Sequence, residues 1–278
     1  MDEQELKQGI TKAVEDVRKT KPMAPSITNT VTVNFVANAQ LAVGGAAAMV
    51  YLADEAEAIA SISQSFYVNL GTMFDFYMDT LEPLSDYLHE NNHKWVLDPV
   101  AAGLGQMRSQ AIDYFKDKTP TIIRANATEI LTIAEMWGLA SNSKTKIRGV
   151  EAEDEVEEAK DAAIAIASYT GGVVAVSGKV DLITDGKVIV HSYGGSEMME
   201  NITGAGCSLA GVCAIYECVT DSLTAAVTAS QIYNLAGKIA SKKANGPGSF
   251  ESEFLDCLYN LSSEDIANNK FEIEELDV

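Results

Sequence analysis

The chain has 278 residues, 47% of them hydrophobic, and its 40 acidic against 20 basic side chains give a formal net charge of −20. This length and apolar content suffice for a large α/β core, while so acidic a surface repels nucleic acid and anionic membranes. We therefore expect a soluble protein that binds neither. An anionic ligand then requires a local cluster of donors or a metal ion.

The cysteines and the N-terminus both indicate a cytoplasmic protein. All four cysteines lie in the last third of the chain, none in a C-x-x-C pair, and histidine is scarce. This pattern disfavours disulfides and a structural zinc site. The first residues are acidic with no apolar signal segment, and the longest small-apolar stretch, residues 41–53, is too short to cross a bilayer.

In chain order, an N-terminal helix over residues 1–20 is followed by short apolar runs that alternate with amphipathic segments. Buried strands are predicted at residues 47–52, 66–70, 95–98, 121–124 and 173–177. Helices are predicted at 74–91, where apolar side chains recur at helical spacing, and at 151–169. The alternation predicts a single α/β domain over residues 1–278, with a mainly parallel sheet flanked by helices.

The later part of the chain adds an antiparallel element and a helical region. Asp185 and Gly186, between apolar runs at 180–184 and 187–191, predict a hairpin with a type I′ turn. Residues 206–268 are predicted to be almost entirely helical, with a break at 245–248 after which Ser249 caps a new helix. Residues 269–278 are expected to form an acidic tail.

Polar residues follow several of the predicted strands directly. Ligands of parallel sheets bind beyond the carboxyl ends of the strands, so these residues are candidates for one crevice. They are found at 69–72, 98–100, 124–126 and 177–179. Arg124 is a candidate for binding polyphosphate, or for a surface ion pair. Ser177 is a candidate phosphate donor, or the start of a turn.

Asn126 and Glu129 have the spacing of a capping box, in which the two side chains cap the start of a helix. That structural interpretation competes with a functional one. In the functional interpretation Glu129 and Asp98 hold Mg²⁺, partly through water molecules, as that ion prefers.

Residues 203–207, with the sequence TGAGC, run into an apolar segment that is predicted to be a helix. Glycines let a ligand approach the backbone, and a helix start offers unpaired N–H groups, so the stretch suits a phosphate. Cys207 would then be an acid–base or nucleophilic group beside that phosphate. The alternative is a helix cap built of small residues for close packing.

An ordered series of motifs connects these sites. It contains SITN at 26–29, GG at 44–45, NLGT at 69–72, LDPV at 97–100, IRAN at 123–126, SGKVD at 177–181, TGAGC at 203–207 and GPGSF at 246–250. The series resembles the hydroxyethylthiazole kinase family of the ribokinase-like superfamily, over roughly residues 20–255. Most ribokinase-like enzymes carry Asp at the position of Cys207, and the cysteine is typical of the thiazole kinases.

The resemblance implies a ribokinase-like single domain without a separate lid, and ATP-dependent, Mg²⁺-requiring phosphorylation of 4-methyl-5-(2-hydroxyethyl)thiazole in thiamine biosynthesis or salvage. It also implies a homotrimer with sites at subunit interfaces, in which residues 26–38 complete a neighbour's pocket. The implied roles are catalysis for Cys207; thiazole binding for Met49, Gly204, Asn29 and Gly71; ATP binding for Arg124, Ser177 and Asn126; and metal binding for Asp98 and Glu129. For Met49, ordinary core packing is the alternative.

The chain departs from the family's usual residues at four positions. Pro25 stands in place of His, Ala47 in place of Pro, and Ala101 and Ala125 in place of Gly. Two other functions stay open. One is a ribokinase-like kinase acting on the hydroxymethylpyrimidine half of thiamine. The other is an inactive thiazole- or nucleotide-binding protein, and the presence of four residues argues against it: Asp98, Arg124, Glu129 and Cys207.

Overall fold

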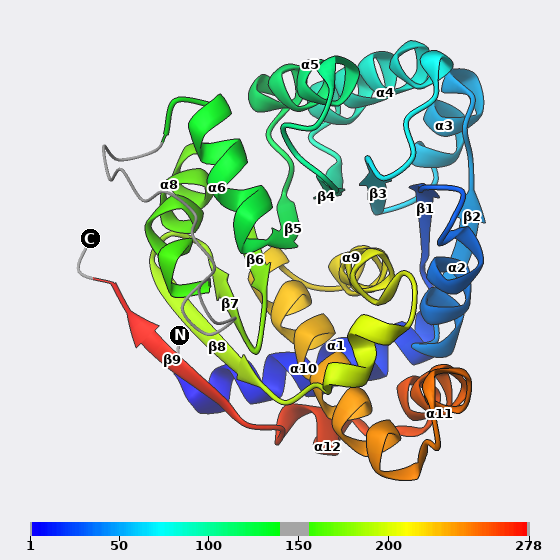
Figure 1. Ribbon diagram of the computed structural model, residues 1–278, viewed down its shortest axis with the longest axis vertical. Coiled ribbons are helices and arrows are strands. Elements are labelled where there is room, and N and C mark those ends of the chain that lie inside the picture. Colours follow the sequence, from blue (N-terminus) through cyan, green and yellow to red (C-terminus); the bar gives the residue numbers. More distant parts are fainter. Residues whose placement is uncertain (1, 140–155, 277–278) are drawn as a thin grey trace.

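The computed structural model describes residues 2–139 and 156–276, which form a nine-stranded sheet covered by helices on both faces (Figure 1). The strand order is β2-β1-β3-β4-β5-β6-β7-β8-β9, parallel as far as β6 and antiparallel beyond it. The bounds are β1 Met23–Ile27, β2 Ala46–Met49, β3 Ser65–Asn69, β4 Lys94–Asp98, β5 Ile122–Asn126, β6 Val173–Ser177, β7 Val180–Thr184, β8 Val188–Tyr193 and β9 Phe271–Glu275.

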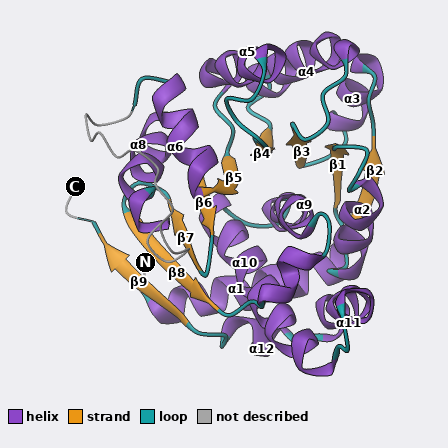
Figure 2. Cartoon of the chain, viewed as in Figure 1, coloured by secondary structure: helices purple, strands orange, loops and turns teal. Residues whose placement is uncertain are grey.

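The helices form two layers, one on each face of the sheet. The strands curve around α9 and α10, and α3 to α8 lie on the outer side of that curve (Figure 2). The inner layer contains α1 Glu3–Thr20, α2 Val33–Ala42, α9 Ala205–Glu217, α10 Ser222–Lys243, α11 Pro247–Asn260 and α12 Ser263–Ala267. The outer layer contains α3 Ala53–Ala60, α4 Met78–Glu90, α5 Gln106–Phe115, α6 Ala127–Met136 and α8 Lys160–Thr170. Short 3₁₀ turns complete the chain at η1 Asp75–Tyr77, η2 Lys116–Lys118 and η3 Glu197–Asn201.

The two layers produce two cores because successive side chains of a strand point to opposite faces. In β3, Tyr67 packs in the core under α9 and α10, whereas Phe66 and Val68 pack in the core under α3 and α4. Strands buried on both faces are apolar throughout, and this is why the parallel sheet could be predicted from apolar runs.

Helix α9 lies against the middle of the sheet and is buried along nearly its whole length. Small residues allow this close packing. A Cβ on Gly211 would come within 3.0 Å of Val36 of α2, and one on Gly45 within 2.5 Å of Ile215. The first turn of α9 is thereby held among the carboxyl ends of β1, β3, β4 and β5.

The predicted fold class is confirmed, and several details of the prediction are wrong. The 180–191 hairpin is present, but a type I′ turn needs positive φ at both central residues, and Asp185 does not have it. Asp185 Oδ1 instead accepts hydrogen bonds from the N–H groups of Lys187 and Val188, and only Gly186 adopts positive φ, at 84°. Ser249 does not cap α11, because Pro247 occupies the first helical position and Gly246 precedes it.

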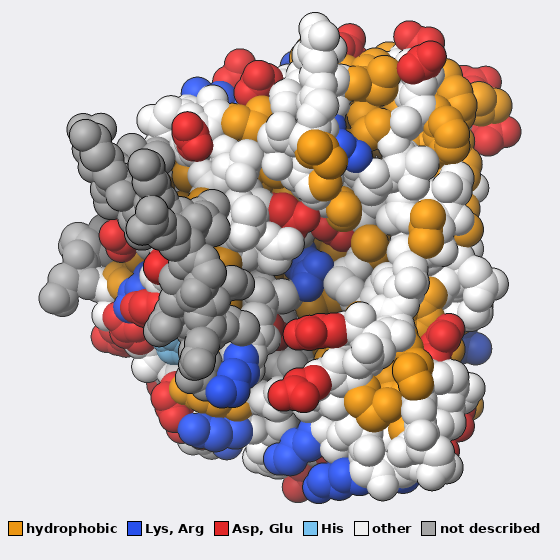
Figure 3. Space-filling view, in the orientation of Figure 1, with side chains coloured by type: hydrophobic (Ala, Val, Ile, Leu, Met, Phe, Trp, Pro, Cys, Tyr) orange, Lys and Arg blue, Asp and Glu red, His pale blue; other side chains and the backbone are white. Residues whose placement is uncertain are grey.

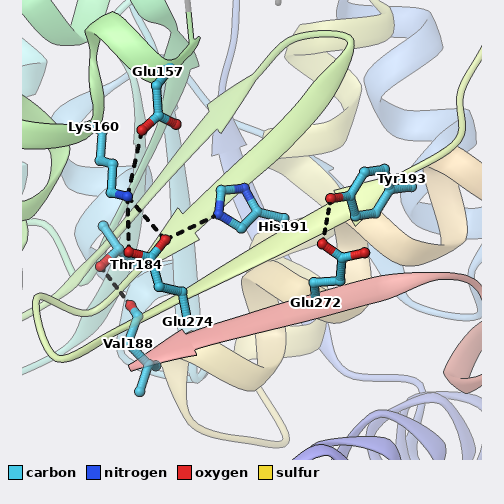
Figure 4. A network of polar contacts seen from close by, with 8 residues as sticks. All are labelled: Glu157, Lys160, Thr184, Val188, His191, Tyr193, Glu272 and Glu274. Atoms are coloured by element: carbon cyan, nitrogen blue, oxygen red, sulfur yellow. Dashed lines mark hydrogen bonds and ion pairs between the residues drawn. The ribbon is translucent and has the colours of Figure 1, made fainter. Parts of the chain in front are cut away.

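Two strands were not predicted. β1 contains Pro25 at its centre, a residue that is disfavoured inside a sheet. β9 lies within the segment expected to be an acidic tail, and it pairs with β8. Its carboxylates have partners there. Glu274 contacts Lys160 and His191, and Glu272 accepts a hydrogen bond from the Tyr193 hydroxyl at 2.8 Å (Figure 4).

The other predicted elements agree with the structure within a few residues. The helix expected at 74–91 is η1 followed by α4, and the region from 206 to 268 contains α9 to α12. Of the helix expected at 151–169, the first five residues lie outside the described ones, residues 156–158 are helical, and α8 covers 160–169. All four cysteines are free thiols. Across residues 2–139 and 156–276, no helix combines the length and apolar character needed to cross a membrane.

Candidate active site

The carboxyl ends of the parallel strands gather most of the predicted site residues around the start of α9. β3 ends at Asn69, β4 at Asp98 and β6 at Ser177, and Arg124 lies near the end of β5. Figure 3 shows a hollow near the middle of this face, between β5 and α9, in which basic and acidic side chains lie together. The crevice expected from the sequence is therefore a real feature of the fold.

Two glycines shape the first turn of α9. Gly204, the N-cap residue, has φ of 95°, and a Cβ there would come within 2.8 Å of the Thr32 side chain. A Cβ on Gly206 would lie 2.6 Å from Nη1 of Arg124. The guanidinium thus lies directly beside unpaired N–H groups of a helix start. The two together form a site for an anion of the size of a phosphate group.

Arg124 is surrounded by groups that fix its position and charge. Its Nε and Nη2 both donate to Ser177 Oγ, with Nε at 3.1 Å. Burial lowers the pKa of Arg124, but the carboxylates of Asp98 and Asp181 raise it more, and the result lies above its ordinary value. A permanently charged fork is therefore held at the site, ready to bind phosphate oxygens.

Asp98 is the most deeply buried carboxylate of the cluster. Its side chain is 1% exposed, and burial raises its pKa to about 6 although Arg124 opposes that shift. Oδ2 accepts from Asn69 Nδ2 at 2.8 Å and lies 3.1 Å from the Tyr67 hydroxyl. Since a carboxylate with such a pKa is mostly ionised at neutral pH, Asp98 contributes a negative charge beside Arg124.

Glu129 forms the capping box that the sequence indicated as the structural alternative. Its backbone N–H donates to Asn126 Oδ1, and its Oε2 accepts from the Asn126 N–H. Its Oε1 accepts from the N–H of Ala101 at 2.8 Å. One carboxylate therefore ties the loop after β4 to the start of α6. Ala101 adopts φ of 58°, a conformation that favours glycine, the residue that the resemblance led us to expect there.

A metal site built from protein groups alone is not found. Within the described ranges, no three His, Cys, Asp or Glu side chains converge as metal ligands would. Asp98 and Glu129 still suit Mg²⁺. This ion usually keeps several water molecules and binds through one or two carboxylates plus the phosphates of its substrate. The electrostatic influence of Glu129 on the pKa of Asp98 indicates that the two carboxylates lie near each other.

Cys207 lies in the first turn of α9, facing the loop after β1. Asn29 Nδ2 lies 3.5 Å from its Sγ. Burial, reinforced by Asp98, raises the pKa of the thiol to about 11. The thiol is therefore protonated at neutral pH and is a weak proton acceptor.

The substrate residues implied by the resemblance are only partly brought together. Gly71 lies against Asn29, and a Cβ at that position would come within 2.7 Å of the Asn29 side chain. Met49 ends the edge strand β2, pairs in register with Ser26, and is half-buried. Because β1 separates β2 from β3 and β4, Met49 lies across β1 from the strands that end at Asn69 and Asp98.

Asn69 was expected at the crevice without a role of its own, and three further residues of the site, Tyr67, Asp181 and Asn234, were missed. Tyr67 and Asn69 bind Asp98, while Asp181 accepts from the Gly178 N–H at 3.1 Å and from Asn234 at 3.0 Å. Asp181 and Asn234 thereby buttress the turn after Ser177. In the sequence, Asn69 and Asp181 belong to motifs of the series. Asp98 and Asn234, with which they form hydrogen bonds, lie far along the chain, so the spacing of the motifs does not predict these contacts.

Known proteins resemble both the fold and the sequence. A solved structure of a ribokinase-like superfamily protein from Enterococcus faecalis V583 superposes with a TM-score of 0.62 at 13% identity, covering 93% of this chain and 94% of that one. A solved hydroxyethylthiazole kinase protein from Pyrococcus horikoshii OT3 superposes with a TM-score of 0.85 at 27% identity, covering 97% of this chain and 100% of that one. The fold is thus that of the ribokinase-like proteins, and the candidate site lies at the carboxyl edge of its sheet.

The sequence comparisons narrow the assignment. Hydroxyethylthiazole kinase from Bifidobacterium adolescentis is 49% identical over 273 residues, covering 94% of this chain and 93% of that protein. The model of the hydroxyethylthiazole kinase family matches residues 14–264. The chain belongs to the hydroxyethylthiazole kinase family, whose members are phosphotransferases that act on a hydroxyl group.

Proposed function

We propose that this protein transfers the γ-phosphate of ATP to the hydroxyl of 4-methyl-5-(2-hydroxyethyl)thiazole, a step of thiamine metabolism. The observation that carries the proposal is the contact between Arg124 and the first turn of α9. It places a fixed cation and unpaired backbone donors on one side of a crevice that also contains Asp98. In a family of thiazole kinases, that arrangement suits a phosphate in transfer.

On the nucleotide side, Arg124 and Ser177 bind phosphate oxygens, and Asn126 lies at the exposed rim, next to the phosphates. Asp98 and Glu129 would hold Mg²⁺ when ATP is bound. When bound, the ion neutralises charge on the phosphate oxygens. The helix-start amides at Gly206 and Cys207 stabilise the charge that develops during transfer.

On the acceptor side, Asn29, Gly71 and Gly204 border the space where the thiazole binds, and Cys207 lies next to its hydroxyl. The raised pKa keeps the Cys207 thiol protonated at neutral pH, so it does not take up the hydroxyl proton before transfer. A loose transition state does not need early removal of that proton, so orientation and electrostatics suffice. We accordingly assign Cys207 to contact with the hydroxyl, with at most a weak role as a base.

We also propose a cytoplasmic homotrimer in which a neighbouring subunit completes the site. Every residue of the edge strand β2 is partly exposed, and Met49 at its end is the predicted thiazole contact. Apolar side chains near that edge are exposed, among them Val31 at 70% and Leu52 at 56%. Figure 3 shows hydrophobic side chains gathered over α3 and α4 on the same flank. Activity per chain should then fall on dilution below the dissociation constant of the trimer, whereas constant activity per chain from monomers would exclude a shared site.

The direct test is an ATP-consumption assay with hydroxyethylthiazole and hydroxymethylpyrimidine side by side. The proposal expects rapid ADP release and a phosphorylated thiazole with the first acceptor, and little turnover with the second. Preferential use of the pyrimidine would identify a different kinase of this class. Binding of ATP and thiazole without product would identify a catalytically inactive protein.

A further inference from the structure

The amide of Asn69 has every hydrogen-bonding position filled. Asn69 is fully buried. Its Oδ1 accepts from Gly71 N at 2.9 Å and from Asn29 Nδ2 at 3.0 Å. Its Nδ2 donates to Asp98 Oδ2 at 2.8 Å and to the Tyr67 hydroxyl at 3.0 Å. An amide can make two bonds as acceptor and two as donor, so no position is left over.

The orientation of this amide follows from its partners. An ionised carboxylate only accepts hydrogen bonds, so Asp98 requires the NH₂ group of Asn69 on its side. The N–H of Gly71 only donates, and it requires the oxygen on the other side. Rotating the amide by half a turn would set oxygen against carboxylate and donor against donor. The charge of Asp98 therefore determines where the Asn69 oxygen points.

The hydrogen bonds of Asn29 orient its side-chain amide in the same way. Its Oδ1 accepts from the N–H groups of Val31 and Thr32, both at 3.1 Å. Its Nδ2 donates to Asn69 Oδ1 and lies 3.5 Å from Cys207 Sγ. One hydrogen of the Asn29 amide is thus held by Asn69, and the other is directed at the thiol, beside the predicted position of the acceptor hydroxyl.

We infer that Asn69 is a positioning residue for phosphoryl transfer, which fixes the Asn29 amide as a donor to the acceptor hydroxyl by connecting it to Asp98. The inference rests on the proposed function, because it concerns the acceptor side of that site. Asn69 itself is fully buried and does not touch the substrate. It acts through Asn29, and it links the acceptor side of the site to the carboxylate on the phosphate side.

A purely structural role predicts something different. A buried amide that only stabilises the fold lowers the melting temperature when it is removed, and leaves turnover by the remaining folded protein unchanged. A positioning residue lowers kcat beyond any effect on stability, since a misplacement of about 1 Å near the reacting atoms costs up to about 10²-fold. Turnover and stability must therefore be measured on the same variants.

The test is a double-mutant cycle of Asn69→Leu and Asn29→Ala, measured as kcat, the KM of each substrate, and melting temperature. Asn69→Leu should lower kcat between about tenfold and a hundredfold, with the KM for ATP unchanged within about threefold. If Asn69 acts through Asn29, the double variant should lose no more than the Asn29→Ala variant alone, again within about threefold.

Two further variants complete the design. Asn269→Leu is a matched control, because Asn269 is a buried amide that donates to the Tyr193 carbonyl oxygen at 2.9 Å, on the antiparallel part of the sheet. It should lower the melting temperature and leave kcat unchanged. Gly71→Ala displaces Asn29 without removing a polar group, and it should lower kcat even if Asn69→Leu does not fold.

The outcomes separate this inference from the proposed function. Losses that multiply in the double variant, or an unchanged kcat in Asn69→Leu, would overturn the inference while wild-type turnover of hydroxyethylthiazole stands. Absence of wild-type turnover in the same assay would overturn the proposed function itself.

Discussion

The parallel and antiparallel parts of the sheet use polar residues in opposite ways. In the parallel part, charged groups lie inside the protein at the strand ends, and the pKa values of Asp98 and Arg124 are both raised. In the antiparallel part, apart from Asp181, which is buried near the start of β7 beside the site, charges lie nearer the surface, as in the Lys160–Glu274 pair (Figure 4), whose side chains are 21% and 44% exposed. Electrostatic interactions are strong where water is excluded and weak where it is not. Function should therefore depend on the parallel part of the sheet and on Asp181 beside it.

The largest expected effect is at Arg124. Arg124→Ala removes the permanent cation of the phosphate site, and we expect kcat/KM for ATP to fall about 10³-fold. Arg124→Lys keeps the charge but loses the fork, and it should recover only part of the loss. Steady-state kinetics over a range of ATP concentrations measures both. Wild-type kinetics in Arg124→Ala would show that the nucleotide does not bind at this edge of the sheet.

Asp98→Asn should lower kcat about 10²- to 10³-fold and yet stabilise the folded protein at neutral pH. The folded pKa of about 6 lies above the ordinary 3.8, so the folded state binds the proton more tightly than the unfolded state does. Stability contributed by this group is thus greatest below pH 4 and is lost as pH rises to about 6. The Asp98→Asn variant has no carboxylate to ionise, so its folded state does not lose this stability as the pH rises.

Thermal unfolding at several pH values tests whether the substitution stabilises or destabilises the folded protein. The melting temperature of Asp98→Asn should exceed that of wild type above pH 6 and should converge with it towards pH 4. Asp181→Asn is the matched comparison, since burial also raises the pKa of Asp181 to about 6. A melting temperature lower than wild type for both variants at pH 7.5 would contradict this account of their burial.

Glu129→Gln should weaken the dependence of kcat on Mg²⁺ and move half-saturation to a higher Mg²⁺ concentration. We expect the fall in kcat to be about tenfold to a hundredfold, less than for the fully buried Asp98. A Mg²⁺ titration of initial rates measures it. An unchanged titration would leave Glu129 with its structural role alone, as the tie between Ala101 and α6.

Cys207→Ala should lower kcat by less than about tenfold, because a thiol with a pKa of about 11 supplies little base catalysis at neutral pH. Cys207→Asp should retain or raise activity, as related kinases carry Asp there. A loss of several hundredfold in Cys207→Ala would instead show that the thiol has a direct chemical role.

The smallest effects concern stability alone. Ala101→Gly relieves a left-handed conformation and should raise stability by no more than about 1 kcal/mol, or about 2–4 °C in Tm. Ala102→Gly is the control, because Ala102 does not have positive φ, and it should lower Tm. A lower Tm for Ala101→Gly than for Ala102→Gly would mean that the backbone at Ala101 is not strained.

In the antiparallel part, Lys160→Ala should cost less than about 1 kcal/mol and leave kcat unchanged, since the pair it breaks is exposed. A change in kcat would show that activity also depends on this exposed pair.

The sequence predicted the parallel part of the fold well, because buried strands are apolar throughout and their polar ends stand out. Asp98, Arg124 and Ser177 were found in this way. The links among Asn29, Asn69 and Tyr67 could not be predicted, since they depend on how distant strands align. β9 was missed because its glutamates resemble a solvated tail until Lys160 and His191 are placed beside them.

In the proposed reaction, ATP and the acceptor meet at the carboxyl edge of the sheet and react in one direct transfer. The most direct test is the configuration of the product made from ATP with a chiral γ-phosphate. One in-line transfer inverts that configuration, and this is the result expected from a protonated Cys207. Retention would require a phosphorylated enzyme intermediate and would contradict the account.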